Sequence, residues 1–235
     1  MCRKSSAAAG KTRPLFALVA ALPCLALACT AGCQSWPFRH RDRTAMITPA
    51  MRMATVREAG ARARDEGPDE QQAVCAQLAQ QIQTEPDPIV RGAIQEAVAG
   101  LDAPLASQIL TAGLQDENRR VRMTCCRELG RRGETAAIDQ LAQLVRADED
   151  FDVRMAAVDA LGNIKTEASV IALAAALKDR DPAMQYAGVQ AMRGASGQDL
   201  GNDVQAWRQY AATLQAPGEN REIAVAAQPD SSKPY

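Results

Sequence analysis

Apolar residues in the middle of the chain recur every three or four positions, and the whole pattern recurs about every 31 residues. Copies aligned on a Val-Arg pair or its counterpart begin at Val90, Val121, Val153 and Met184, so the steps between them are 31, 32 and 31 residues. The short spacing predicts amphipathic helices, and the long one is typical of a solenoid of stacked helical units. We therefore expect an all-α fold, an α-α superhelix of about five helical pairs with disordered termini.

Four copies of the pattern fill residues 87–214, and each copy predicts two helices. The repeats span 87–117, 118–149, 150–180 and 181–214. Their first helices are expected at 88–100, 119–129, 151–161 and 182–192, and their second helices at 103–115, 134–146, 167–178 and 203–214. Gly130 and Gly162 directly follow two of the first helices, where we expect a left-handed glycine to end the helix.

The chain on either side of the repeats follows a different pattern. Residues 48–86 predict one further helical pair without the Val-Arg pattern, which we expect to cap the stack because end units of solenoids are usually atypical. Trp207, Tyr210 and Leu214 form an apolar face that is expected to cover the other end, with ligand stacking on Trp207 as the alternative. Residues 215–235 are polar, contain three prolines and are expected to be disordered.

The repeated pattern resembles the HEAT family, in particular the short bacterial HEAT-like repeats also seen in phycobilisome lyases. The resemblance covers residues 87–214 and is strongest in the second and third units. In the third unit it is carried by Asp150, Val153, Arg154, Ala157, Leu161 and Gly162. It implies a HEAT-like solenoid whose second helices line the concave face.

Charged residues follow the same repeat. An acid or amide precedes each first helix, and an arginine follows four residues later in three of the four units. The acid stands where it can cap free N–H groups, and the arginine can pair with it or with the acid of the neighbouring repeat. Since such residues form ladders in HEAT-like repeats, which this chain resembles, we expect a structural ladder of Asp87, Arg91, Arg122, Asp150, Arg154 and Asp181.

Few residues suggest chemistry. Cys125 and Cys126 are neighbours on a predicted helix, a poor arrangement for a disulfide, so we expect Cys125 to act as a small buried hydrophobic residue. The single histidine, His40, lies outside the repeats, and no phosphate loop, nucleophile elbow or zinc-protease helix is found. We predict no enzymatic activity, no catalytic or metal-binding residue and no cofactor. A net charge of −1 gives no reason to expect a nucleic-acid partner.

The amino terminus has the pattern of an export signal. Residues 1–13 carry four basic residues and no acid, and an apolar run of about 15 residues follows. Thr30-Ala31-Gly32-Cys33 resembles a bacterial lipobox, in which the cysteine is lipidated. We therefore expect a lipoprotein-type signal peptide at 1–32, lipidation at Cys33 and a tether at 33–47.

Three alternatives remain for this segment: processing at Cys29, an ordinary cleaved signal, and an uncleaved anchor helix. The lipoprotein interpretation places the protein in the bacterial cell envelope, exported and lipid-anchored to a membrane, facing the periplasm or the cell exterior. Gln34 follows the lipidated cysteine where an aspartate often marks inner-membrane retention, which leans toward the outer membrane without deciding between the two.

The second helices supply the candidate partner-binding face. Polar side chains are expected to face solvent there at Gln108, Thr111, Asp139, Gln140, Gln143 and Glu167. The sequence therefore predicts a non-enzymatic scaffold for an unidentified protein or peptide, and it does not indicate an oligomeric state. The alternative implied by the family resemblance is a bilin-lyase-like enzyme or chaperone, although an aromatic content of 3% supplies few residues for a chromophore pocket.

Overall fold

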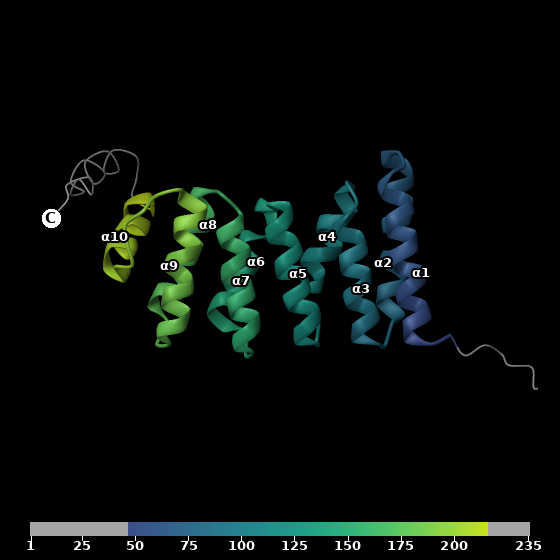
Figure 1. Ribbon diagram of the computed structural model, residues 1–235, viewed down its shortest axis with the longest axis horizontal. Helices are drawn as coiled ribbons and strands as arrows, with labels where there is room; N and C mark the ends of the chain where they lie inside the picture. Colours follow the sequence, from purple (N-terminus) through teal and green to yellow (C-terminus); the bar gives the residue numbers. More distant parts are fainter. Residues whose placement is uncertain (1–46, 216–235) are drawn as a thin grey trace, which may run out of the picture. The chain divides into compact units, whose positions relative to one another are not determined.

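A computed structural model describes residues 47–215, which contain helices and turns but no strand (Figure 1). The helices are α1 (Pro49–Arg64), α2 (Pro68–Thr84), α3 (Pro88–Ala99), α4 (Pro104–Gly113), α5 (Arg119–Arg132), η1 (Thr135–Ala137), α6 (Ile138–Ala147), α7 (Phe151–Asn163), α8 (Glu167–Leu173), η2 (Ala176–Lys178), α9 (Pro182–Ser196) and α10 (Val204–Gln215). The expected signal peptide, nearly all of the tether and the expected tail beyond residue 215 lie outside the described residues.

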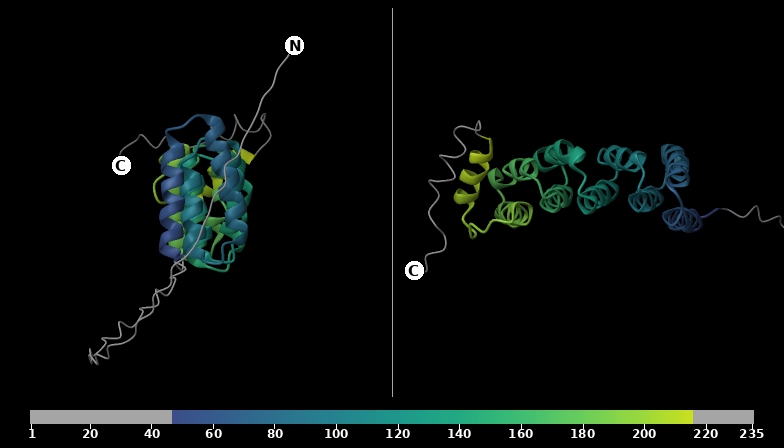
Figure 2. Two further views of the ribbon diagram at one scale, coloured as in Figure 1. Left: turned by 90° about the vertical axis from the view of Figure 1, so that its right-hand side faces the viewer. Right: turned by 90° about the horizontal axis from the view of Figure 1, so that it is seen from above.

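The α-helices pack as consecutive pairs in two layers, which confirms the expected α-α superhelix of five helical pairs (Figure 2). The first helices α1, α3, α5, α7 and α9 lie side by side, each against the next (Figure 1). The second helices form the other layer, where α2 contacts α4, and α8 contacts both α6 and α10. Contact between α4 and α6 is weaker than in any of these pairs.

Local sequence signals fix where the helices begin. Proline occupies the first turn of α1, α2, α3, α4 and α9, where its missing N–H is not needed. Thr48 caps α1 by accepting a hydrogen bond from the backbone N–H of Met51 at 3.3 Å. A capping box starts α8, where Thr166 and Ser169 each accept a hydrogen bond from the other's backbone N–H.

The buried side chains divide into two clusters. One is built from α1 to α4 and includes Val56, Leu78 and Ile94. The other runs from α3 to α10 and includes Leu129, Leu161 and other residues of the later repeats. Helices α3 and α4 contribute to both clusters, so the two halves of the core meet in the first repeated unit, residues 87–117.

The expected roles of Gly130 and Gly162 are wrong. Both lie inside helices, and the left-handed glycines that end α5 and α9 are instead Gly133, with φ of 66°, and Gly197, with φ of 70°. A Cβ at Gly130 would lie 2.6 Å from the Cα of Ala160, which shows that this glycine lets α7 approach α5 closely. A Cβ at Gly162 would likewise lie 2.9 Å from the Cα of Ala191, so this glycine lets α9 approach α7 closely.

Several helix ends also differ from expectation. The first helix of the fourth unit continues to Ser196, four residues beyond the expected end, and Gly197 ends it. The first helix of the second unit continues to Arg132, three residues beyond the expected end, and Gly133 ends it in the left-handed conformation, while Gly130 packs against Ala160. The second helix of the third unit ends early at Leu173 and is followed by the single turn η2. Hydrogen bonds there run from residue i+3 to residue i, for example from the N–H of Ala174 to the carbonyl of Ile171, so the helix tightens as it ends.

Among residues 47–215, no helix combines the length and the apolar character that crossing a membrane would require.

Replacing Gly130 by alanine is expected to lower the free energy of unfolding by roughly 1–3 kcal/mol, because the new methyl group would overlap the backbone of Ala160. Gly92→Ala is the matched control inside α3, where a Cβ meets no atom within 4 Å, and it is expected to raise that free energy by roughly 0.5–1 kcal/mol. Denaturant unfolding measures both. Equal effects of the two substitutions would contradict the close approach of α5 and α7.

Candidate functional site

The loops that enter the first helices carry a regular set of carboxylates. Glu85, Asp116, Asp148 and Asp179 each accept a hydrogen bond from the backbone N–H two residues later, at 3.0, 2.8, 2.9 and 2.9 Å. The receiving residues are Asp87, Asn118, Asp150 and Asp181, and each in turn caps its helix. Helices α3, α5, α7 and α9 therefore each start with two successive side-chain caps.

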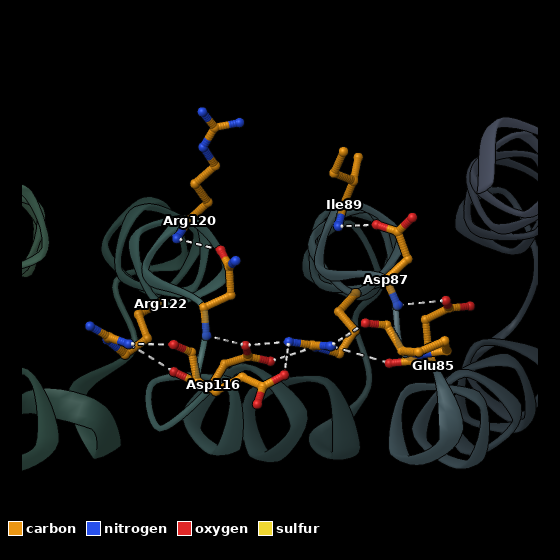
Figure 3. Close-up of polar contacts among 10 residues, drawn as sticks. Glu85, Asp87, Ile89, Asp116, Arg120 and Arg122 are labelled. Atoms are coloured by element: carbon orange, nitrogen blue, oxygen red, sulfur yellow. Dashed lines mark hydrogen bonds and ion pairs between the residues drawn. The ribbon is translucent and has the colours of Figure 1, made fainter.

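Arginines join these loops from one repeat to the next (Figure 3). Arg91 donates through Nε and Nη2 to the two carboxylate oxygens of Asp116, both at 2.8 Å. Arg122 makes the same bidentate pair with Asp148, with both distances 2.9 Å. Arg52 of α1 pairs with Glu85 in the same way, so the series starts in the capping pair.

The same guanidinium groups also reach back to the preceding loop. Nη1 of Arg91 donates to the carbonyl oxygens of Glu85 and Pro86, and Nη1 of Arg122 donates to those of Asp116 and Glu117. The side chains of Arg122 and Asp148 are only 9% and 5% exposed. The hydrogen bond that Arg122 donates to Asp148 raises the pKa of Arg122 above its ordinary value, so the guanidinium stays charged.

The pairing weakens toward the carboxyl end. Arg154 donates one hydrogen bond, to the carbonyl oxygen of Asp148 at 3.1 Å, and its guanidinium lies 5.3 Å from the ring centre of Phe151. Its Nε is buried and has no hydrogen-bond partner among the described residues. In the fourth unit Gln185 takes the place of the arginine and donates to the carbonyl oxygen of Asp179 at 2.7 Å.

The acids expected in the ladder cap their own helices, as expected, but they do not pair with the arginine four residues later. Asp87, Asp150 and Asp181 each accept a hydrogen bond from the backbone N–H two residues later, and Arg91 pairs with Asp116 of the next loop instead of with Asp87. The geometry explains this, because a cap carboxylate already faces the free N–H groups of its own helix. Asp150 also accepts a hydrogen bond from the exposed Arg119 at 2.8 Å, which lowers its pKa. The sequence contained a signal for the true partners, since residues 85, 116, 148 and 179 are all acidic at the repeat spacing.

Cys75, Cys125 and Cys126 are all buried and free. Burial raises the pKa of all three thiols, that of Cys126 to about 12. A thiol with so high a pKa is a poor nucleophile and metal ligand at neutral pH. Among the described residues, no three histidine, cysteine or carboxylate side chains cluster as metal ligands do.

Trp207 is completely buried, and its indole N–H donates to the carbonyl oxygen of Gly201 at 2.9 Å. Tyr210 packs edge-on against it, with ring centroids 5.9 Å apart. Trp207 thus closes the last repeat as expected, and its ring is not open to stack on a ligand.

The six residues of the candidate partner-binding face do not all face solvent. Gln108, Asp139, Gln143 and Glu167 are exposed, whereas Thr111 and Gln140 are half-buried. The hydroxyl of Thr111 donates to the carbonyl oxygen of Ser107, which occupies it within its own helix. The four exposed positions come from α4, α6 and α8, so they lie on the second-helix layer.

Two grooves open on this layer. The first lies between α2 and α4 over α3, has a volume of about 400 Å³, and has apolar walls that include Ala79, Ile82, Leu105 and Ile109. The second follows α6 and α8, has a volume of about 650 Å³, and includes Ile138 and Ile171. Both volumes fall within the range of pockets that bind small ligands or single side-chain clusters.

Substituting Arg122 is expected to destabilise the protein more than substituting Arg154. Arg122→Ala strands the buried carboxylate of Asp148 and should lower the free energy of unfolding by on the order of 3 kcal/mol. Arg154→Ala removes one hydrogen bond and the contact with Phe151, at a cost of roughly 1 kcal/mol.

Thermal and denaturant unfolding followed by circular dichroism measure these changes. Arg120→Ala is the matched control, because the Arg120 side chain is exposed and points away from the ladder (Figure 3). Its effect should stay within about 0.5 kcal/mol. A loss for Arg122→Ala no larger than for the control would remove the ladder as a source of stability.

Comparison with known families agrees with this geometry. Residues 107–193 match the family described as HEAT repeats, from the middle of α4 to near the end of α9. No curated protein matches the chain. The chain therefore contains HEAT repeats over residues 107–193, and repeats of this type generally serve as scaffolds for protein interaction.

Proposed function

We propose that this protein is a non-enzymatic HEAT-repeat scaffold of the bacterial cell envelope, held to a membrane by a lipid on Cys33 and binding a protein or peptide partner through its second-helix layer. The observation that carries the binding part is the pair of apolar grooves on that layer, bordered by exposed polar side chains. Apolar recesses with polar rims are what protein recognition sites require.

The charged residues that stand out in the sequence support a scaffold. Arg91 and Arg122 are bound to carboxylates and to loop carbonyl oxygens. The acids that precede the first helices cap those helices. These groups hold the repeats together and are engaged with one another. The bilin-lyase-like alternative stays a prediction from the resemblance.

The anchoring part is supported by the sequence of the amino terminus. A basic segment, an apolar run and the sequence Thr30-Ala31-Gly32-Cys33 together resemble the signal of a bacterial lipoprotein. Several acyl chains on one residue give stable membrane attachment, where a single chain gives marginal attachment.

Lipidation is tested in a bacterial host fed an alkyne-tagged fatty acid, with mass spectrometry of the mature amino terminus. The wild-type chain should incorporate the label at Cys33 and sediment with membranes, whereas Cys33→Ser should lose both properties. Cys29→Ser is the matched control and should behave as wild type. An unmodified amino terminus, or label that is lost only in Cys29→Ser, would overturn the assignment of Cys33.

Partner binding is tested with a photo-crosslinking amino acid at Gln143, which is exposed on α6 of the second-helix layer. In intact cells it should give one reproducible crosslinked envelope protein. The same probe at Asp152, exposed at the start of α7 in the other layer, should give none. Crosslinks of equal yield from both positions, or from neither, would contradict binding through the second-helix layer.

A further inference from the structure

The groove along α6 and α8 is apolar and open to solvent. Its apolar lining consists of Ile138 and Ala142 of α6 and of Ala168, Ile171, Ala172, Ala174 and Ala175 of α8 and the residues that follow it. Ile171, Ala172 and Ala175 keep part of their surface in contact with water. Because removing apolar surface from water is favourable, this lining favours an aliphatic occupant.

The groove also has a charged end. Arg146 stands near the end of α6 and Lys178 is the last residue of η2, whereas Asp139 stands at the start of α6. Since α6 and α8 are the second helices of successive repeats, they run in the same direction, and the two cations share one end of the groove. Both cations are exposed, and no ion pair within residues 47–215 includes either of them. This end therefore favours an occupant that brings acidic groups.

The chain leaves its last helix at this same groove. Gln215, the final residue of α10, lines the groove together with Arg146 and Lys178. The next residues are Ala216-Pro217-Gly218. Proline cannot continue a helix, and the pair Pro-Gly fits the two central positions of a tight turn. The following residues therefore begin beside the groove and can return along it.

The chemistry of those residues matches the groove in the same order. Residues 219–222 contain two glutamates and one arginine, a net charge of −1, and they come first, nearest the cationic end. The apolar run Ile223-Ala224-Val225-Ala226-Ala227 follows. In an extended chain Ile223, Val225 and Ala227 project to one side, and the run spans about 13 Å. The groove wall from Ala168 to Ala175 covers about 10 Å of helix, a comparable length.

We propose that residues 219–227 occupy the groove along α6 and α8 of their own molecule. The β-branched side chains of the run lie against the alanine walls, and the two glutamates lie beside Arg146 and Lys178. Because only a few residues join this segment to the groove, its effective concentration there is on the order of millimolar, which favours it over the same segment of a second copy. An acyl chain would fit the walls but would leave both cations without an acid.

The occupied groove has a consequence for binding that rests on the proposed function. A partner that binds the second-helix layer at α6 and α8 must displace residues 219–227. The segment therefore regulates access to this part of the layer, while the groove between α2 and α4 stays open.

Photo-crosslinking within the full-length chain tests the occupancy. A diazirine-bearing aliphatic amino acid replaces Val225, and mass spectrometry maps the crosslinks formed at low micromolar protein concentration. They should fall within one chain, mainly on residues 138–147 and 167–178. The same amino acid at Ser232, five residues beyond the run, is the matched control and should give at least fivefold fewer crosslinks there. Crosslinks spread evenly over both helical layers, or formed mainly between two chains, would overturn the proposal.

Charge reversal tests the cationic end. Arg146→Glu with Lys178→Glu should lower the yield of the Val225 crosslink at least fivefold, and Glu219→Lys with Glu222→Lys should do the same without altering the groove. All four substitutions together should restore most of the yield. Arg120→Glu with Lys165→Glu changes two exposed cations outside the groove and should leave the yield unchanged. An unchanged yield in the first two variants, or no recovery in the combined one, would refute the charge pairing.

The crosslink from Gln143 separates this inference from the proposed function. With Glu219→Lys and Glu222→Lys, the yield of the envelope protein captured from Gln143 should rise at least threefold, because the groove is then open. If Val225 crosslinks to α6 and α8 while Gln143 captures no protein, the segment occupies the groove and the proposed function is wrong. If Gln143 captures its partner while Val225 does not crosslink to α6 or α8, the proposed function stands and this inference is wrong.

Discussion

The stack depends on a buried charge being satisfied where one repeat meets the next. A guanidinium group has five donors in a fixed plane, and Arg122 can use them only if Asp148 stands on one side and the carbonyl oxygens of Asp116 and Glu117 on the other. Those partners belong to successive loops. Satisfying one arginine therefore sets the distance and the register between two helical pairs.

The close approach of the first helices works toward the same end. Gly130 lets the backbone of α7 lie directly against α5, and the small Ala160 completes the contact. Without this approach the loops would stand too far apart for a bidentate pair. The small residues in the middle of the helices and the paired charges at their ends are thus two parts of one interface. A larger side chain in the middle would move the loops apart and break the ion pairs at the ends.

The sequence predicted the helical pairs well because the period of the apolar positions and the caps are local signals. The failures share a cause. The role of Gly130 depends on the neighbouring helix α7, and the partner of Arg91 belongs to the neighbouring repeat, so neither could be identified from a single helix. The acids at 85, 116, 148 and 179 could have been found by their spacing, whereas the unpaired Nε of Arg154 could not, because hydrogen bonding is known only once the side chains are placed.

The division of the core has a mechanical consequence. Its two clusters meet at α3 and α4, and the second layer is least connected between α4 and α6. The array therefore consists of two blocks that are joined through the contacts of α5 with α3 and with α4. A bending load would move α4 and α6 apart or together at that joint. The solenoid therefore bends most easily in one direction, which a uniform array of identical repeats would not do.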